Sequence, residues 1–227
     1  MKLSIIVPVY NERGTLLECI ARVESVALPL GYDKEIIVVD DGSTDDARSV
    51  FERLKSRHIV LRHERNRGKG AAIRTALSLA TGKYVVTQDA DLELDPTDLA
   101  RMLQKVLDED LLVLYGSRRL HGGKEGVDPF FYSGGVFLSL LANVLYGQQL
   151  TDEPTCYKMF RTEFLKSLPL TCERFEYCPE VTALTALRGI RIQEVPISYH
   201  PRTIQEGKKV RFRDGIAAAW TLIKYRV

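Results

Sequence analysis

The segment LSIIVPV, Leu3–Val9, decides the fold, because its apolar, β-branched residues run on without the polar alternation of a half-exposed strand. EIIVVD, Glu35–Asp40, repeats this pattern after an amphipathic stretch, Thr15–Val26, that has the residue spacing of a helix. Continuous apolar strands joined by helices are typical of a parallel sheet covered on both faces. The start of the chain therefore predicts a β-α-β unit.

The alternation of strands and helices continues along the first half of the chain. Strand-like segments lie at 58–63, 84–88 and 111–116, and helical patterns lie at 45–55, 70–80 and 97–107. This order predicts a doubly wound, mostly parallel α/β sheet that binds ligands at the carboxyl ends of its strands.

In the second half of the chain the regular alternation of strands and helices ends. After a Gly-rich charged loop we expect an apolar helix at 131–146, a short strand in PTCYKMF, a helix at 176–188, a strand in IRIQEVPISYH, a mobile loop in PRTIQEGKK and a terminal helix at 212–226. Pro196 lacks a backbone N–H, which predicts that its strand lies at an edge or bulge. No interdomain linker is visible, so we expect a single domain.

Composition excludes several classes of protein. A net charge of +2 over 227 residues does not favour nucleic-acid binding, although residues 191–227 hold eight Lys and Arg against three Asp and Glu, which favours a phosphate or a membrane surface as partner. The four cysteines lack zinc-ligand spacing and are expected to be free thiols in the cytoplasm. The longest apolar stretch, Gly134–Gly147, is shorter than the ~20 residues that span a bilayer, so we expect no transmembrane anchor.

Polar residues follow the first two expected strands. Tyr10 and Glu12 come just after the first strand, and Asp40 and Asp41 close the second. Helix capping accounts for the GSTDD that follows but not for Asp40 and Asp41, which precede the turn. Carboxylates at this place suit hydrogen bonds to a ribose or a base.

NRGKGAAIRTA, Asn66–Ala76, lies between the third strand and a helix. It has Gly68 and Gly70, but Ile73 stands where a dinucleotide fingerprint requires its third glycine. We therefore predict a tight turn that opens a helix, and not a nicotinamide-dependent oxidoreductase.

The acidic stretch VTQDADLELDP, residues 86–96, follows a buried strand. Asp95 is explained by the start of the next helix. On extended backbone Asp89, Asp91 and Glu93 would share one face, and oxygen ligands of this kind suit Mg²⁺ or Mn²⁺ completed by substrate phosphates. The alternative is a solvated acidic loop.

These motifs together resemble the family 2 inverting glycosyltransferases, and within them the dolichyl-phosphate and polyprenyl-phosphate sugar synthases. The resemblance rests on VPVYNERG, VVDDGSTD, NRGKGAAIRTA, DADLE, YGSR and EVPISYHPRTIQEGKK, in this order from Leu3 to Lys209. It implies a Rossmann-like GT-A domain over residues 1–227, with a nucleotide-binding half (1–117), an acceptor-side half (118–210) and a terminal amphipathic helix (211–227).

The resemblance also implies roles for particular residues. Asp89, Asp91 and Glu93 match the metal site for Mg²⁺ or Mn²⁺. Asp91, Arg118 and Asp152 are candidate catalytic residues, because divalent and basic charge stabilises a diphosphate leaving group and Asp152 would serve as base for a hydroxyl acceptor. The positions that match donor-binding residues are Pro8, Tyr10, Glu12, Val39, Asp40, Asp41, Asp89, Ala90, Arg118, Arg202 and Lys208.

The acceptor is expected to be polyprenyl phosphate, glycosylated with inversion by a hexose from a donor of the GDP-mannose or UDP-glucose type. One departure bears on this expectation: residues 130–149 contain no Arg or Lys, whereas many relatives carry arginine there for the acceptor phosphate. Lys124, Arg118 or Arg119 are the candidate substitutes.

Two alternatives to a polyprenyl phosphate transferase stay open. One is a soluble transferase with a hydroxyl acceptor, and the other is a non-catalytic subunit that binds nucleotide sugar. The apolar helix and the tail IAAAWTLIKYRV suit a peripheral contact with the cytoplasmic face of a membrane.

Overall fold

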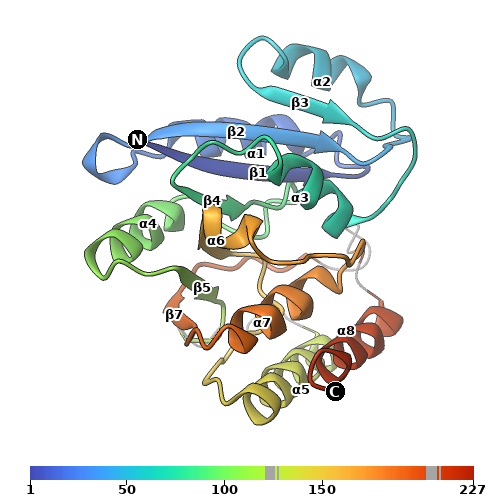
Figure 1. Ribbon diagram of the computed structural model, residues 1–227. Coiled ribbons are helices and arrows are strands. Elements are labelled where there is room, and N and C mark those ends of the chain that lie inside the picture. Colours follow the sequence, from blue (N-terminus) through green and yellow to red (C-terminus); the bar gives the residue numbers. More distant parts are fainter. Residues whose placement is uncertain (121–125, 127, 203–208, 210) are drawn as a thin grey trace.

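A central β-sheet organises the chain (Figure 1). The computed structural model describes residues 1–120, 126, 128–202, 209 and 211–227, and within them seven strands join in the order β3-β2-β1-β4-β6-β5-β7. Strands from both halves share this sheet, which confirms the single α/β domain. The strands are β1 Lys2–Val9, β2 Asp33–Asp40, β3 Ile59–Arg62, β4 Tyr84–Thr87, β5 Val113–Ser117, β6 Lys158–Arg161 and β7 Gln193–Pro196.

Strand pairing confirms the mostly parallel sheet. β1 pairs in parallel with β2 and β4, so that Ile5 lies between Ile36 and Val86. β6 pairs antiparallel with both β4 and β5, a direction that the sequence did not predict. β7 pairs with β5 at the edge of the sheet, as Pro196 predicted.

Helices cover both faces of the sheet because successive strand residues point to opposite sides. Leu3 and Ile5 pack on one side with α1, α2 and α4, whereas Ile6 packs on the other with α3, α6 and α7. Both sides of β1 are therefore apolar, which explains the continuous apolar run. The helices are α1 Leu16–Ser25, η1 Pro29–Gly31 (a 3₁₀ turn), α2 Arg48–Leu54, α3 Lys69–Leu77, α4 Asp98–Asp108, α5 Pro129–Tyr146, α6 Thr162–Lys166, α7 Tyr177–Leu187 and α8 Phe212–Lys224.

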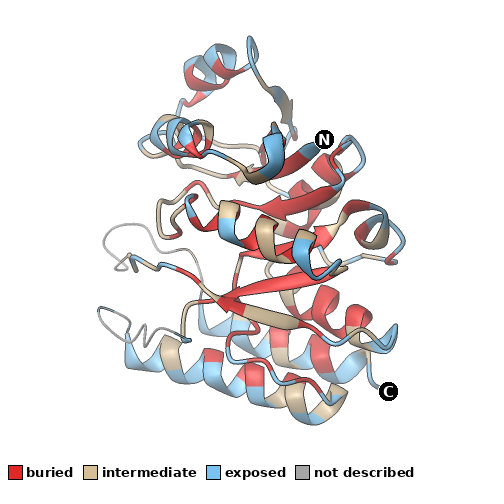
Figure 2. Cartoon of the chain, turned by 90° about the vertical axis from the view of Figure 1, so that its left-hand side faces the viewer, coloured by how far each residue is buried: buried red, intermediate tan, exposed pale blue. Residues whose placement is uncertain are grey.

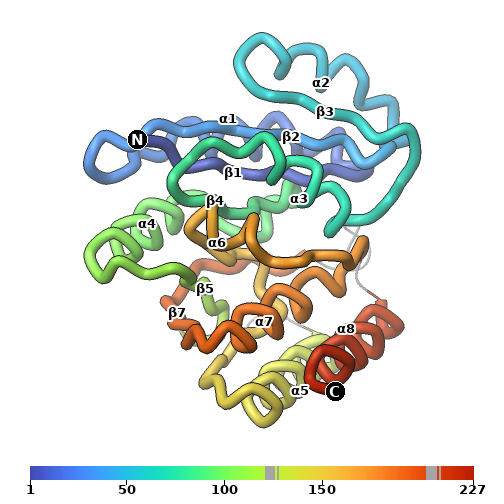
Figure 3. Tube along the Cα trace, viewed as in Figure 1, coloured from blue at the N-terminus to red at the C-terminus, as the bar shows by residue number. Residues whose placement is uncertain are grey.

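Two helices form an outer layer at one end of the molecule. α5 and α8 lie side by side, with α7 between them and the sheet (Figure 3), and Ala142, Ala183 and Leu222 form the buried contact among the three. The outer sides of α5 and α8 are largely exposed (Figure 2).

Helix α5 begins two residues earlier than the sequence predicted. With 18 residues and a mean hydropathy of 1.3 it is long and apolar enough to cross a membrane, a possibility that the apolar stretch counted from Gly134 had excluded. Length and composition alone do not establish a span, because helices packed on a protein pass the same test. One side of α5 packs against α7 and α8, and only 22% of the helix is buried.

Candidate active site

A cavity of about 1270 Å³ opens at the carboxyl ends of β1, β2 and β4, where a sheet of this type binds ligands. It extends from these loops to the outer helices, so one end is charged and the other apolar. The charged end is lined by Pro8, Tyr10, Glu12, Asp41, Asn66, Gly68, Lys69, Asp89, Ala90, Asp91, Glu93, Arg202 and Lys209. The apolar end is lined by Phe130, Phe131, Phe137, Leu138, Phe212, Ile216 and Ala219, and Arg118 and Arg119 lie on the wall as well.

The loops after β1 and β2 are fastened to each other. Asn11 has a φ of +51°, and its side-chain oxygen accepts the Thr44 N–H at 2.8 Å, while the Ser43 hydroxyl accepts the Asn11 N–H at 3.1 Å. Asp40 accepts the Ser43 N–H at 2.8 Å and is buried. Asp40 and the core residue Val39 do not line the cavity. They support the loop of the expected donor site and do not form its surface.

Asp41 holds the turn that precedes α3. Its buried carboxylate accepts the N–H groups of Arg67 at 2.9 Å and Gly68 at 2.7 Å, and it lies 2.7 Å from His63 Nδ1. The Asn66–Ala76 segment is therefore the tight turn and helix start that the sequence predicted, with Gly68 at a φ of +103°. Asp41 lines the donor end but already has protein partners.

Lys69 is a site residue that sequence reasoning missed. Its ammonium lies 2.7 Å from Asp89, and the two side chains are 16% and 24% exposed. Burial opposes ionisation of Asp89, but the ammonium outweighs it, so the pKa of Asp89 lies below its ordinary value. The sequence did hold a signal for Lys69, because this residue lies in a turn that follows a predicted strand.

The acidic stretch after β4 is a turn. β4 ends at Thr87, Leu92 has a φ of +64°, and the Asp91 carboxylate accepts the Glu93 N–H at 3.1 Å. The expectation that Asp89, Asp91 and Glu93 share a face of extended backbone is therefore wrong. Asp91 is the carboxylate with excess negative charge around it: burial first, then Asp89 and Glu93, raise its pKa to about 7.

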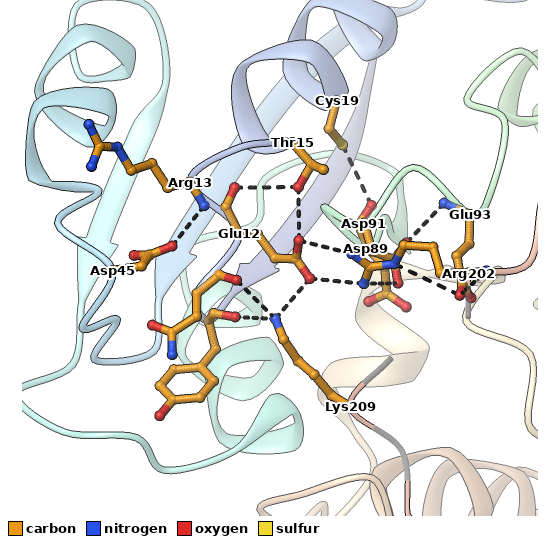
Figure 4. A network of polar contacts seen from close by, with 12 residues as sticks. Glu12, Arg13, Thr15, Cys19, Asp45, Asp89, Asp91, Glu93, Arg202 and Lys209 are labelled. Carbon is orange, nitrogen blue, oxygen red and sulfur yellow. Dashed lines mark hydrogen bonds and ion pairs between the residues drawn. The ribbon is translucent and has the colours of Figure 1, made fainter. Parts of the chain in front are cut away.

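Two basic residues from the C-terminal part of the chain contact the carboxylates of Glu12, Asp91 and Glu93 (Figure 4). Arg202 is 2.9 Å from Glu12 and 3.4 Å from Asp91, and its N–H donates to Glu93 at 2.9 Å. Lys209 donates to Glu12 at 2.8 Å and to the Tyr10 carbonyl. Arg202 thus lines the cavity, whereas Lys208 lies outside the described residues.

The three predicted metal ligands, Asp89, Asp91 and Glu93, suit a divalent cation only in part. Among the described residues, no three His, Cys, Asp or Glu side chains converge on a point where they would share one ion. Glu93 instead accepts hydrogen bonds from the Arg202 N–H and, at 3.3 Å, from the Tyr199 hydroxyl. Asp91, which in the described part of the chain has two carboxylates and only Arg202 as a basic neighbour, at 3.4 Å, fits a cation whose other ligands come from a diphosphate, the usual arrangement for Mg²⁺.

Arg118 and Asp152 form a buried pair on the wall of the cavity. Arg118 donates through Nε at 2.7 Å and Nη2 at 2.8 Å to the two oxygens of Asp152, which is fully buried. Burial opposes ionisation of Asp152, yet Arg118 holds its pKa below the ordinary value. The base role expected for Asp152 stays a prediction, and in this geometry both of its oxygens accept hydrogen bonds from Arg118. The Arg118 guanidinium lies 5.0 Å from the centre of the Tyr199 ring.

Arg119 follows β5 by two residues and reaches helix α5. Its Nη1 donates to the Ser139 hydroxyl at 3.2 Å and to the Thr151 carbonyl at 2.6 Å. Gly135 leaves room for this guanidinium, because a Cβ at Gly135 would lie closer than 3.0 Å to Arg119 Nη2. An arginine from outside the helix thus places its charge against α5. Of the other two candidates, Arg118 is bound to Asp152 and Lys124 lies outside the described residues.

Fold and site together define a GT-A type glycosyltransferase. The chain belongs to glycosyl transferase family 2, whose family model matches residues 4–168, and the family expected from the sequence is confirmed. It is 28% identical over 211 residues to the undecaprenyl-phosphate 4-deoxy-4-formamido-L-arabinose transferase of Klebsiella pneumoniae (strain 342), covering 91% of this chain and 62% of that protein. It is also 28% identical over 214 residues to the dodecaprenyl-phosphate galacturonate synthase of Rhizobium johnstonii, covering 89% and 60%. The chain thus spans about three fifths of the length of these relatives.

Solved structures share the fold. Glucosyl-3-phosphoglycerate synthase from Mycobacterium tuberculosis, in complex with Mn²⁺, UDP and phosphoglyceric acid, matches with a TM-score of 0.72 and 20% identity, over 99% of this chain and 78% of that one. The same enzyme in complex with Mg²⁺ and UDP matches with a TM-score of 0.68 and 22% identity, over 99% and 79%.

Proposed function

We propose that the chain transfers a hexose from a nucleotide diphosphate sugar to polyprenyl phosphate with inversion, with Mg²⁺ or Mn²⁺ as cofactor. The observation that carries this proposal is the cavity itself, which joins an acidic end at Asp91 to an apolar end between α5 and α8, with Arg119 on the wall. A nucleotide diphosphate with its cation suits the charged end, and an isoprenoid chain suits the apolar end. The names of both polyprenyl-phosphate relatives support this acceptor.

The donor end supplies charge of both signs. Asp91, with Asp89 beside it, would hold the cation, which supplies positive charge to the departing diphosphate. Arg202 and Lys209 would bind the diphosphate oxygens, and Tyr10 and Asp41, which also line this end, would meet the nucleoside. Because negative charge grows on the leaving group as the glycosidic bond breaks, these basic residues stabilise the transition state.

The acceptor end favours a phosphate over a hydroxyl. A hydroxyl needs a base to take its proton, but both oxygens of Asp152 accept hydrogen bonds from Arg118 and the residue is fully buried. A phosphate monoester is already anionic and attacks without a base. Arg119 Nη1 donates to the oxygens of Ser139 and Thr151 and also lies 3.7 Å from Asp152, which already pairs with Arg118. Two guanidinium groups thus share one carboxylate, which leaves net positive charge for that phosphate.

The outer face of α5 and α8 would lie on the cytoplasmic surface of a membrane. Its apolar side chains are well exposed, for instance Phe137 at 56%, Val144 at 74% and Trp220 at 63%. Phe130 and Phe212, from the starts of the two helices, are in ring contact at 5.6 Å beside the apolar end of the cavity. A lipid acceptor would thus enter the cavity directly from the membrane.

A transfer assay tests the proposal. The protein is incubated with Mn²⁺ or Mg²⁺ and with labelled GDP-mannose, UDP-glucose or UDP-N-acetylglucosamine, with and without polyprenyl phosphate. Butanol-extractable label that requires polyprenyl phosphate is the expected result. Label confined to a water-soluble product would instead favour a hydroxyl acceptor, and donor binding without turnover on any acceptor would favour a non-catalytic subunit.

A further inference from the structure

Glu180, in the first turn of α7, is a fully buried carboxylate that gathers donors from two distant segments. Its Oε1 accepts the Thr171 N–H at 2.7 Å, the Thr171 hydroxyl at 2.8 Å and the Cys172 N–H at 3.0 Å. The Tyr225 hydroxyl, just beyond α8, donates to the same oxygen at 2.6 Å. A buried carboxylate depends on such donors, so Glu180 fixes residues 171 and 172 firmly.

The segment that Glu180 holds supports the turn of the donor site. The carbonyls of Arg174 and Glu173 accept the N–H groups of Gly70 at 3.2 Å and Ala71 at 2.9 Å, at the start of α3. A Cβ at Gly70 would lie closer than 3.0 Å to the Cys172 carbonyl oxygen, so the two backbones are in close contact.

Lys69 lies in the turn between Gly68 and Gly70, whose N–H groups are held from two sides. Asp41 holds the turn from one side through the Arg67 and Gly68 N–H groups, and residues 172–174 hold it from the other. The Lys69 ammonium reaches Asp89 from between these two supports. Its placement therefore depends on the segment that Glu180 fixes.

We infer that Glu180 is a positioning residue for the donor site, acting through residues 171–174 and Lys69, and that Tyr225 ties the end of α8 to the same carboxylate. This inference rests on the proposed function, because it assigns Glu180 to nucleotide binding. Glu180 lies behind the donor turn. Among the described residues, its hydrogen-bond partners are Thr171, Cys172 and Tyr225, none of which lines the acceptor end of the cavity. The expected effect is therefore on the donor and not on the acceptor.

The test uses calorimetric binding of UDP and GDP with Mn²⁺ to the full chain. Glu180→Gln places an amide –NH₂ against the Cys172 N–H whichever way it is turned, since both carboxylate oxygens accept that N–H. We expect the Kd of the nucleotide to rise about tenfold, and about threefold for Tyr225→Phe, which removes one donor. Tyr146→Phe is the matched control, because that hydroxyl also bonds to α8 but donates to the Leu222 carbonyl and not to Glu180.

The design separates positioning from a general loss of stability. In a Lys69→Met background, Glu180→Gln should change the Kd much less than in the wild type, and the acceptor KM should stay unchanged. An unchanged Kd in both Glu180→Gln and Tyr225→Phe, an additive effect in the double variant, or an equal effect of Tyr146→Phe would each overturn the inference. If the wild type binds neither nucleotide, the proposed function itself fails, and the inference fails with it.

Discussion

Replacing Gly135 by alanine should weaken acceptor binding while leaving the fold intact. The new Cβ would lie closer than 3.0 Å to Arg119 Nη2, the far end of a flexible side chain, so the guanidinium moves and the backbone does not. Gly134→Ala is the matched control, because no atom lies within 4 Å of a Cβ there. Both changes gain up to about 1 kcal/mol in helix propensity, so stability alone does not distinguish them.

The size of the effect follows from the bonds that Arg119 would give to a phosphate. A hydrogen bond to a charged group contributes about 1.5–3 kcal/mol, so losing one should raise the acceptor KM about 10- to 100-fold. The donor KM should not change, because Arg119 is not among the groups around Asp91.

Initial rates with a short-chain prenyl phosphate at fixed, saturating donor measure the two KM values. Arg119→Met gives the acceptor KM of an enzyme without this guanidinium. The acceptor KM of Gly135→Ala should approach that value, while that of Gly134→Ala stays at the wild-type value. A Gly135→Ala variant that melts no earlier than the Gly134→Ala variant and keeps the wild-type acceptor KM would refute the role of Arg119.

Further predictions concern the charged end and the outer helices. Asp91→Asn should abolish metal-dependent turnover in a Mn²⁺ titration, and an undiminished rate would exclude Asp91 as ligand. Because the pKa of Asp91 is about 7, its proton competes with the metal at lower pH, so Mn²⁺ affinity should fall by up to about tenfold per pH unit below 7 in calorimetry. Lys69→Met leaves Asp89 unpaired and should lower the free energy of unfolding by about 1–3 kcal/mol in urea denaturation, with partial recovery in Lys69→Met/Asp89→Asn. Trp220→Ser should reduce sedimentation with anionic vesicles, and an unchanged bound fraction would contradict membrane contact through α8.

The apolar runs predicted the sheet because a parallel strand buried on both faces has few alternatives. They did not predict the direction of β6, since a short buried strand reads alike in either direction. The turn after β4 was read as extended because nothing in DADLE requires a φ of +64° at Leu92, which the Asp91 side chain helps to stabilise. The place of Arg119 depends on a contact with Gly135, which sequence spacing alone does not encode.

The ion pairs at the donor end explain why cation and diphosphate should bind together. In the structure Arg202 and Lys209 neutralise Glu12 and Asp91, so a cation alone would compete with two basic groups and a diphosphate alone with the carboxylates. A metal diphosphate carries both charges, so its cation can pair with Asp91 while its oxygens pair with Arg202 and Lys209. Binding the two together therefore offsets much of the cost of breaking these half-buried pairs.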